Sequence, residues 1–466
     1  MEYVSTRGSA PALDFEGVTL AGLASDGGLY VPREWPRFSE SEIAALAGLP
    51  YAELAVQVMK PFVGDSLTED RLRDLCQRSY GRFAHAAVTP LVQLDQRQWL
   101  LELFHGPTLA FKDVALQLLG RLFEEFLSRS DDHLTIVGAT SGDTGSAAID
   151  AVAGRERVDI FMLHPNGRVS DVQRRQMTTV LAPNVHNIAI EGTFDDAQAM
   201  VKRMFNDPGM TGRFHIGAVN SINWARLMAQ VVYYFAAALQ LGAPARKVAF
   251  SVPTGNFGDV FAGYVAAQMG LPIERLIVAT NVNDILHRAL SDGDYSAGTV
   301  TPTAAPSMDI QVSSNFERLL FDCGGRDGLA LAEQMRSFEA SKAMRLTNAQ
   351  REGAAQLFTS ARADAADMAQ AMRWAHEECG EVIDPHTAIG LHAARAADLP
   401  ADIPVVTLAT AHPAKFRDAV ERATGLRPHL PSRIGDLFQR EEAYAELPGD
   451  YDAIAAYVAE RATPTG

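Results

Sequence analysis

A lysine stands where an expected strand gives way to an expected helix. An apolar run ends at Phe104, the pair Gly106-Pro107 interrupts the chain, and Lys112 opens the next amphipathic segment. The helix dipole disfavours a cation at this end of a helix, and burial would further favour the neutral amine. Schiff-base chemistry requires a neutral amine, so Lys112 is a candidate for covalent attachment of an aldehyde. The alternative is a surface lysine that follows a turn.

A glycine-flanked loop is the second candidate. It contains Gly255, Asn256, Phe257 and Gly258, after the expected strand Lys247–Val252 and before an expected helix. Backbone amides at a helix N-terminus bind anions, and glycine lets a phosphate approach closely. The loop has no lysine and is therefore not a Walker A motif. We expect it to bind a phosphate, with an ordinary left-handed turn as the alternative.

The turn from Gly138 to Gly145 also joins an expected strand to an expected helix. Its glycine spacing, and the lack of an acidic residue at the end of the next strand, disfavour a dinucleotide site. The hydroxyl groups of Thr140, Ser141 and Thr144 suit a carboxylate or phosphate at the helix N-terminus. An ordinary capped turn is the alternative.

Two further turns carry polar side chains. Asn220 and Arg226 border the start of a long helix, where Arg226 could direct a bidentate fork at a phosphate or pair with an acidic neighbour. Thr410 follows the last strong strand and offers a hydroxyl group, with His412 and Lys415 close behind it. A histidine beside a proline is more often structural than catalytic.

These turns are expected to meet in one place. In open α/β sheets, ligands bind at the carboxyl ends of the strands, which is where all five turns fall. An amine combined with a phosphate-binding loop indicates a cofactor that has both an aldehyde and a phosphate. Pyridoxal phosphate meets this description and serves as an electron sink.

The elements that position these turns alternate between strand and helix, which predicts an α/β fold with largely parallel sheets. The first ninety or so residues indicate a mostly helical N-terminal part, with helices beginning near Ser39 and Thr68. Ser291–Pro306 indicates a loop and Ala330–His376 indicates helices. The expected strands are Trp99–Phe104, His133–Val137, Val158–Leu163, Val185–Ile190, His215–Val219, Lys247–Val252, Leu276–Thr280 and Val405–Ala409.

Composition excludes several classes of protein. The 466 residues include 41 Lys and Arg against 57 Asp and Glu, a net charge of −16, which disfavours binding to nucleic acid or anionic membranes. The three cysteines are far apart in sequence, which excludes a disulfide framework and a paired-cysteine metal or redox site. The N-terminus has no signal-peptide pattern, and the most apolar stretch, Val231–Leu239, is too short to span a bilayer. We therefore expect a cytoplasmic protein.

The sequence resembles the threonine synthase family, within the fold-type II pyridoxal phosphate enzymes, in its longer bacterial and fungal branch. The resemblance covers essentially the whole chain and is strong because many motifs combine. They are Tyr3–Gly8, Leu23–Tyr30, the five turns, Pro306–Ile310, Asp384–Ala388 and His412–Phe416.

The resemblance implies a role for each matched residue. Lys112 corresponds to the cofactor lysine, the loop from Gly255 to Gly258 to the cofactor-phosphate site, and Thr410 to the partner of the pyridine nitrogen. Asp143 stands where related enzymes often have Asn, which leaves its role open. Substrate contacts are implied for Ser141 and Thr144 (carboxylate) and for Asn220 and Arg226 (phosphate).

The implied reaction converts O-phospho-L-homoserine and water to L-threonine and phosphate, without a metal, in a monomer or homodimer. Alternatives are a threonine-synthase-like phospholyase, a serine/threonine dehydratase-type lyase and a non-enzymatic phosphate-binding protein. The implied fold has two α/β domains with the cofactor between them and a mostly helical N-terminal domain. The expected division is 1–88 for the N-terminal domain, 89–125 with 215–466 for the large domain, and 126–214 for the small one.

Overall fold

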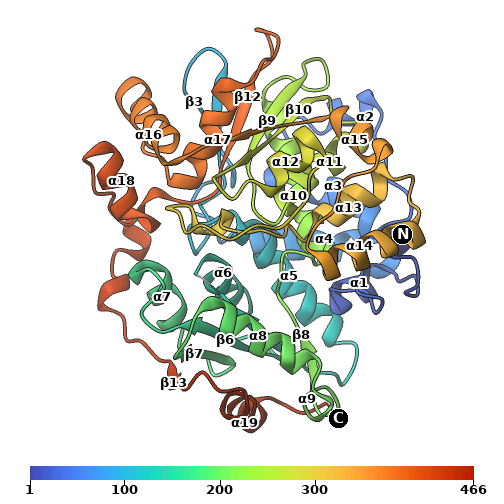
Figure 1. The fold of residues 1–466 in the computed structure, drawn as a ribbon, viewed down its shortest axis with the longest axis vertical. Helices are drawn as coiled ribbons and strands as arrows, with labels where there is room; N and C mark the ends of the chain where they lie inside the picture. Colours follow the sequence, from blue (N-terminus) through green and yellow to red (C-terminus); the bar gives the residue numbers. More distant parts are fainter. Residues whose placement is uncertain (141, 466) are drawn as a thin grey trace. The chain divides into compact units, whose positions relative to one another are not determined.

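The computed structural model describes residues 1–140 and 142–465. These residues fall into two compact units, each with its own largely or wholly parallel sheet and flanking helices (Figure 1). The first unit contains residues 1–18, 23–111 and 221–428, and the second contains 19–22, 112–220 and the chain from 429 onward. The α/β class expected from the sequence is confirmed.

A six-stranded sheet forms the centre of the first unit, in the order β11-β10-β9-β12-β4-β3. All neighbours are parallel except β3 and β4, which pair antiparallel at one edge. The two middle strands β9 and β12 are buried along their whole length, and each sequence is apolar except for one buried hydroxyl residue, Ser251 in β9 and Thr407 in β12. The strands are β3 (Leu91–Gln93), β4 (Gln98–Glu102), β9 (Val248–Pro253), β10 (Ile273–Thr280), β11 (Phe358–Arg362) and β12 (Val405–Ala409).

Helices cover this sheet. Helix α17 packs against β9, β10, β11 and β12, and α11 packs against β9 and β10. Helix α10 is buried along nearly its whole length between α11 and α3. The helices are α10 (Trp224–Gln240), α11 (Gly258–Gln268), α12 (Ile285–Asp292), α13 (Phe316–Cys323), α14 (Gly328–Ser341), α15 (Asn348–Ala355), α16 (Ala365–Cys379), α17 (Pro385–Ala396) and α18 (Arg417–Thr424).

The N-terminal part is mostly helical, as expected. The side chains of Ser39 and Thr68 accept hydrogen bonds from the first turns of α2 and α4, which confirms both predicted helix starts. A short antiparallel pair, β1 with β2, accompanies the helices. The elements are β1 (Tyr3–Ser5), α1 (Phe15–Ala21), β2 (Tyr30–Pro32), α2 (Glu40–Ala45), α3 (Tyr51–Val63) and α4 (Glu69–Tyr80).

The second unit has a five-stranded parallel sheet in the order β13-β7-β6-β5-β8. The C-terminal segment completes it: β13 adds an edge strand beside β7, and Ile454 and Val458 of α19 join the core formed with Ile188 and Ile190 (Figure 1). The elements are α5 (Lys112–Leu127), β5 (Leu134–Ala139), α6 (Asp143–Val152), β6 (Val158–Pro165), α7 (Asp171–Thr178), β7 (Val185–Ile190), α8 (Phe194–Phe205), α9 (Pro208–Thr211), β8 (His215–Gly217), β13 (Ala445–Leu447) and α19 (Tyr451–Arg461).

One local prediction is wrong. The stretch Ala330–His376 was expected to be helical throughout, but Phe358–Arg362 forms strand β11 at the edge of the large sheet. Its five residues are too few to show a helical or strand period, and parallel pairing with β10 decides their conformation. The three-domain division stays a prediction. In the structure the first 88 residues group almost entirely with the large sheet, and the residues from 429 group with the small one.

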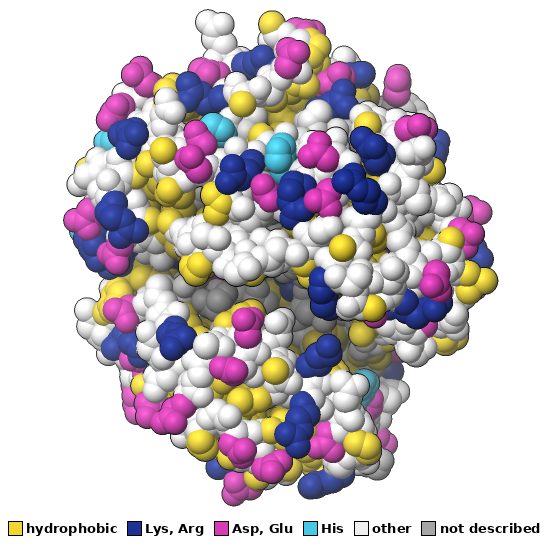
Figure 2. Space-filling model, in the orientation of Figure 1, with side chains coloured by type: hydrophobic (Ala, Val, Ile, Leu, Met, Phe, Trp, Pro, Cys, Tyr) yellow, Lys and Arg dark blue, Asp and Glu magenta, His cyan; other side chains and the backbone are white. Residues whose placement is uncertain are grey.

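The charged side chains are mixed in sign. On the face shown in Figure 2, basic and acidic groups lie interspersed, and the excess of acidic residues does not form a single block. Among the described residues, no helix combines the length and the apolar character needed to cross a membrane.

Candidate active site

The glycine-flanked loop connects β9 to α11 in the first unit. Phe257 adopts the left-handed conformation (φ 63°) as the residue that caps α11, and its ring packs edge-on against Phe316 at 5.1 Å between centroids. The amides of the first helical turn, which begins at Gly258, have no partner within the helix. Together with the positive end of the helix dipole, they form an anion-binding end.

The carbonyl groups of this loop are tied back by the segment before α13. The Ser313 hydroxyl donates to the Gly255 oxygen at 2.7 Å, and the Asn315 side-chain amide donates to the Asn256 oxygen at 2.9 Å. The backbone amide of Asn315 donates to the same Asn256 oxygen at 3.1 Å. Because the carbonyl oxygens are satisfied within the protein, the loop can present its N–H groups to a ligand.

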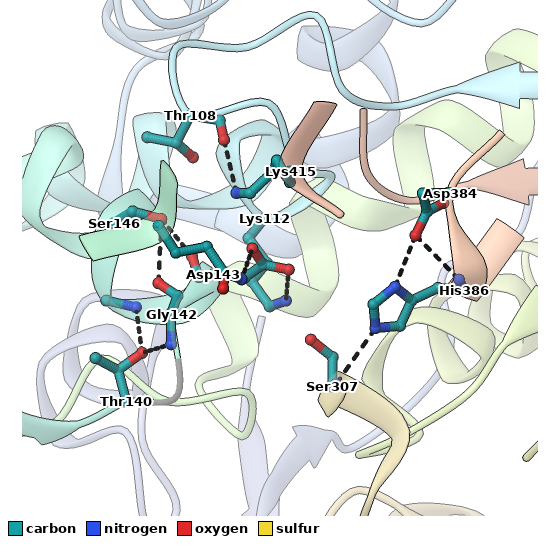
Figure 3. Close-up of polar contacts among 12 residues, drawn as sticks. Thr108, Lys112, Thr140, Gly142, Asp143, Ser146, Ser307, Asp384, His386 and Lys415 are labelled. Carbon is teal, nitrogen blue, oxygen red and sulfur yellow. Dashed lines mark hydrogen bonds and ion pairs between the residues drawn. The ribbon is translucent and has the colours of Figure 1, made fainter. Parts of the chain in front are cut away.

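A buried histidine supports the loop from another side. The Ser307 amide donates to His386 Nε2 at 3.3 Å, and His386 Nδ1 lies 2.7 Å from Asp384 Oδ2 (Figure 3). Since Nε2 accepts, Nδ1 carries the proton and donates to Asp384. A Cβ atom added at Gly255 would lie 2.4 Å from the Ser307 oxygen, so the glycine is required by close packing. Sequence reasoning singled out Pro306–Ile310 and Asp384–Ala388 only as family motifs and missed this support.

Arg226 lies in the first turn of α10 and is buried. Among the residues that the structure describes, its Nε and Nη1 atoms have no hydrogen-bond partner. Burial lowers the pKa of this guanidinium to about 10, which still leaves it charged at neutral pH. Tyr233, two turns along the same face of α10, donates a hydrogen bond to Asp259 in the first turn of α11. The face of α10 that carries Arg226 is therefore directed toward the start of α11.

Thr410 follows β12 and is nearly buried. The chain from Thr108 to Phe111 runs antiparallel beside it: the Phe111 amide donates to the Thr410 oxygen at 2.8 Å, and Ala110 pairs with Ala411. The Lys415 ammonium donates to the Thr108 oxygen at 2.8 Å (Figure 3).

His412 has the structural role that was expected for it. Its Nδ1 atom accepts a hydrogen bond from the Ala414 amide at 3.1 Å and caps the short helix Pro413–Lys415.

In the second unit, Lys112 is the first residue of α5, as the sequence predicts, and is 9% exposed. Its Nζ atom lies 3.7 Å from Asp143 Oδ2, and Asp143 Oδ1 accepts a hydrogen bond from Gln173 Nε2 at 2.8 Å (Figure 3). The residue whose role the sequence left open is thus a counter-charge for the lysine. A carboxylate at this distance favours the protonated amine, which opposes the effect of burial.

In the turn before α6, one hydroxyl group is engaged in hydrogen bonds within the turn itself. Thr140 Oγ1 accepts a hydrogen bond from the Gly142 amide at 2.9 Å (Figure 3). It accepts a second one from the Gly145 amide, also at 2.9 Å. Thr144 is half-buried in the first turn of α6. Ser141, the other predicted carboxylate contact, lies outside the described residues.

The predicted residues are divided between the two units. The first unit contains the glycine-flanked loop, Thr410 and Arg226, and the second contains Lys112, Thr144 and the half-buried Asn220. Within the described ranges, no group of three or more His, Cys, Asp or Glu side chains is arranged to hold a metal ion.

These groups fit pyridoxal phosphate. The cofactor requires an amine for its aldehyde, a nest of amides for its phosphate and a partner for its pyridine nitrogen. The chain supplies a buried lysine, Lys112, at the start of a helix and a hydroxyl group, that of Thr410, after the end of a strand. It also supplies a loop before a helix N-terminus, in which the carbonyl oxygens of Gly255 and Asn256 accept hydrogen bonds from within the protein.

Comparisons with known proteins agree with this fit. A family model described as "Pyridoxal-phosphate dependent enzyme" matches residues 83–363, and models described as "Threonine synthase N terminus" and "Threonine synthase, C-terminal" match residues 2–80 and 387–458. A threonine synthase from Pseudomonas aeruginosa is 56% identical over 461 residues, which cover 99% of this chain and 98% of that protein.

Solved structures give the same result. The crystal structure of pyridoxal-phosphate-bound threonine synthase from Brucella melitensis matches with a TM-score of 0.97 and 51% identity over 99% of both chains. Yeast threonine synthase matches with a TM-score of 0.94 and 40% identity over 99% of this chain and 98% of that one.

The fold and the site define a pyridoxal-phosphate-dependent enzyme of fold type II. The matches extend over the full length of the chain and include both family-specific terminal regions. The chain belongs to the threonine synthase family.

Proposed function

We propose that this enzyme converts O-phospho-L-homoserine and water to L-threonine and phosphate. The reaction removes phosphate from the γ carbon of the substrate and adds water at the β carbon. The observation that carries the proposal is Arg226, a buried guanidinium with two nitrogen atoms that lack a partner among the described residues. A buried charge of this kind needs an anion, and the substrate supplies a phosphate in addition to that of the cofactor.

Bound pyridoxal phosphate supplies an electron sink for the carbanion at the substrate's α carbon. Lys112 would hold the cofactor through its Nζ atom, and its free amine would take up the proton from the substrate's α carbon and then one from the β carbon. The counter-charge on Asp143, 3.7 Å from Nζ, steadies the amine when it carries a proton.

The other assigned residues bind and orient. The amides of Gly255, Asn256, Phe257 and Gly258 would hold the cofactor phosphate, and the Thr410 hydroxyl would be the partner of the pyridine nitrogen. A threonine hydroxyl, unlike a carboxylate, leaves the ring nitrogen free to stay unprotonated.

The substrate has two anionic groups that the protein must bind, a carboxylate and a phosphate. Ser141 and Thr144 bind the substrate carboxylate, and Asn220 and Arg226 bind its phosphate. Arg226 stabilises the charge that develops on the departing phosphate.

We further propose that the enzyme works in the cytoplasm as a monomer or homodimer, on a small-molecule substrate and without nucleic acid. The acidic composition, with a net charge of −16, supports the last point.

The deciding experiment incubates the pyridoxal-phosphate-loaded enzyme with O-phospho-L-homoserine and measures threonine and phosphate together. Equimolar formation of both is the expected result. Formation of 2-oxobutyrate and ammonia with phosphate, and no threonine, would support a lyase that does not add water at the β carbon. Lys112→Ala should abolish product formation. Arg226→Ala should raise KM for the substrate at least about tenfold, because a charge-assisted contact is lost. An unchanged KM would refute the assignment of Arg226.

A further inference from the structure

Asn315 joins two loops that are each assigned to a phosphate. Its side chain is fully buried, and Nδ2 donates to the Asn256 oxygen at 2.9 Å and to the Ser221 oxygen at 3.1 Å. The first acceptor belongs to the cofactor-phosphate loop. The second belongs to the segment that leads into α10 and Arg226. One amide group thus spans the two segments.

Arg318, one turn later in α13, fixes the orientation of Asn315. Its Nη1 atom donates to Asn315 Oδ1, so the oxygen of that amide must face the guanidinium and the nitrogen must face the two carbonyls. Nη2 donates to the Ile222 oxygen at 2.6 Å, and Nε donates to the Tyr30 oxygen at 3.0 Å. Arg318 therefore ties the segment before α10 a second time and anchors the assembly to β2.

The guanidinium of Arg318 also places a positive charge behind both loops. It is completely buried, and the three hydrogen bonds that it makes within the described residues go to neutral oxygens. Burial lowers its pKa to about 9, so the group remains charged at neutral pH. In a weakly screened interior, such a charge favours anions bound nearby.

We propose that Asn315 and Arg318 are positioning residues that hold the cofactor-phosphate loop and the substrate-phosphate segment in one fixed relation, so that both phosphate affinities depend on them. The proposal rests on the proposed function for the identity of the second phosphate. Both residues act through the backbone groups of Asn256, Ser221 and Ile222.

A second residue, Ser313, allows a contact to both loops to be distinguished from a contact to one loop. Ser313 holds only the cofactor-phosphate loop, through the Gly255 oxygen at 2.7 Å. If Asn315 couples the two loops, its loss affects both phosphates, whereas the loss of the Ser313 hydroxyl affects the cofactor alone. This difference distinguishes coupling from general loosening of the fold.

The test compares Asn315→Asp, Arg318→Lys and Ser313→Ala with the unmodified enzyme. Asn315→Asp keeps the size of the side chain but replaces the donor with an acceptor that faces two carbonyl oxygens. Affinity for pyridoxal phosphate is measured by fluorescence titration of the apoenzyme, and KM for O-phospho-L-homoserine is measured at saturating cofactor. The melting temperature of each variant is recorded beside these values.

The matched control is Asn184→Asp in the second unit. Asn184 Nδ2 also donates to backbone oxygens of more than one segment, at 2.9 Å to Val152 and 2.8 Å to Val158, but it touches neither loop. It should lower the melting temperature without changing either affinity.

We expect Asn315→Asp and Arg318→Lys to raise both the cofactor Kd and the substrate KM about tenfold. A change of this size corresponds to the loss of about one buried hydrogen bond at each site. Ser313→Ala should raise only the cofactor Kd. Unchanged affinities in both Asn315→Asp and Arg318→Lys would overturn the proposal, as would a rise in both constants for Ser313→Ala. If Asn315→Asp does not fold, Arg318→Lys decides. If the unmodified enzyme does not use O-phospho-L-homoserine, the proposed function is refuted. The cofactor titrations then still test whether Asn315 and Arg318 position the cofactor-phosphate loop.

Discussion

The backbone amide of Phe111 donates a 2.8 Å hydrogen bond to the carbonyl oxygen of Thr410. Phe111 immediately precedes Lys112, the proposed cofactor lysine, and Thr410 is the proposed partner of the pyridine nitrogen. The Ala110–Ala411 pairing and the bond from the His412 amide to the Leu109 oxygen at 3.1 Å extend this contact into a short antiparallel ladder. The chain from Leu109 to Phe111 is therefore held beside the end of β12 by main-chain hydrogen bonds, which side-chain substitutions barely alter.

Gly255→Ala should weaken the binding of pyridoxal phosphate at least about tenfold. The added methyl group would lie 2.4 Å from the Ser307 oxygen, a backbone atom that cannot move without shifting the loop. Fluorescence titration of the apoenzyme measures the effect. Gly298→Ala is the control, because the nearest atom to its new methyl group lies at 3.4 Å, and it should bind the cofactor normally. Equal affinities for the two variants would contradict the close-packing argument.

Asp143→Asn should leave the fold intact and shift the pH profile of kcat/KM to lower pH. The substitution keeps an oxygen for the bond from Gln173 but removes the negative charge 3.7 Å from Lys112 Nζ, so the protonated amine loses a counter-charge. Initial rates from pH 6 to pH 10 measure the shift. A profile identical to that of the unmodified enzyme would show that this charge does not act on the lysine.

Thr140→Val should destabilise the turn before α6. Valine has the shape of threonine but cannot accept the hydrogen bonds from the Gly142 and Gly145 amides, and leaving buried donors unpaired costs about 1–3 kcal/mol. Denaturant unfolding measures the loss, and kcat/KM should fall with it because the same turn carries Asp143. Thr140→Ser, which keeps the oxygen, should lose much less. Similar losses in both variants would point to the methyl group instead.

The titration of His164 should lower the free energy of unfolding when the pH falls from neutral to mildly acidic. Burial on β6 lowers the pKa of this imidazole, and the charge of Arg174 acts in the same direction. The unfolded state, with a pKa near 6.5, therefore binds the proton more readily than the folded state. The free energy of unfolding falls as pH drops below about 6.5, by at most about 1.4 kcal/mol per pH unit for this one group, and is unaffected above it.

The comparison for this prediction is His164→Phe, which cannot titrate. Urea unfolding of both proteins at pH 7.5 and 5.5 should show a smaller loss of stability on acidification in the variant. Parallel losses in the two proteins would mean that other groups cause the acid sensitivity.

Much of the site could be predicted because its chemistry lies in short, contiguous stretches. Lys112 begins a helix, and the glycine-flanked loop precedes one, as the change from an apolar run to a turn and then an amphipathic segment indicates. The strand β11 was missed because five residues show no period, and its conformation depends on pairing with β10, about eighty positions earlier in the chain.

The sequence by itself determined the alternation of strands and helices, the residue types at the strand ends and the cofactor class that those types require. These properties are local, since they follow from periodicity, turn residues and side-chain chemistry. Only the tertiary structure decided that Asp143 faces Lys112, that His386 supports Ser307 and that Asn315 and Arg318 tie two loops together. Such contacts join residues 30 to nearly 100 positions apart, and only the packing of the chain brings them within hydrogen-bonding or ion-pairing distance.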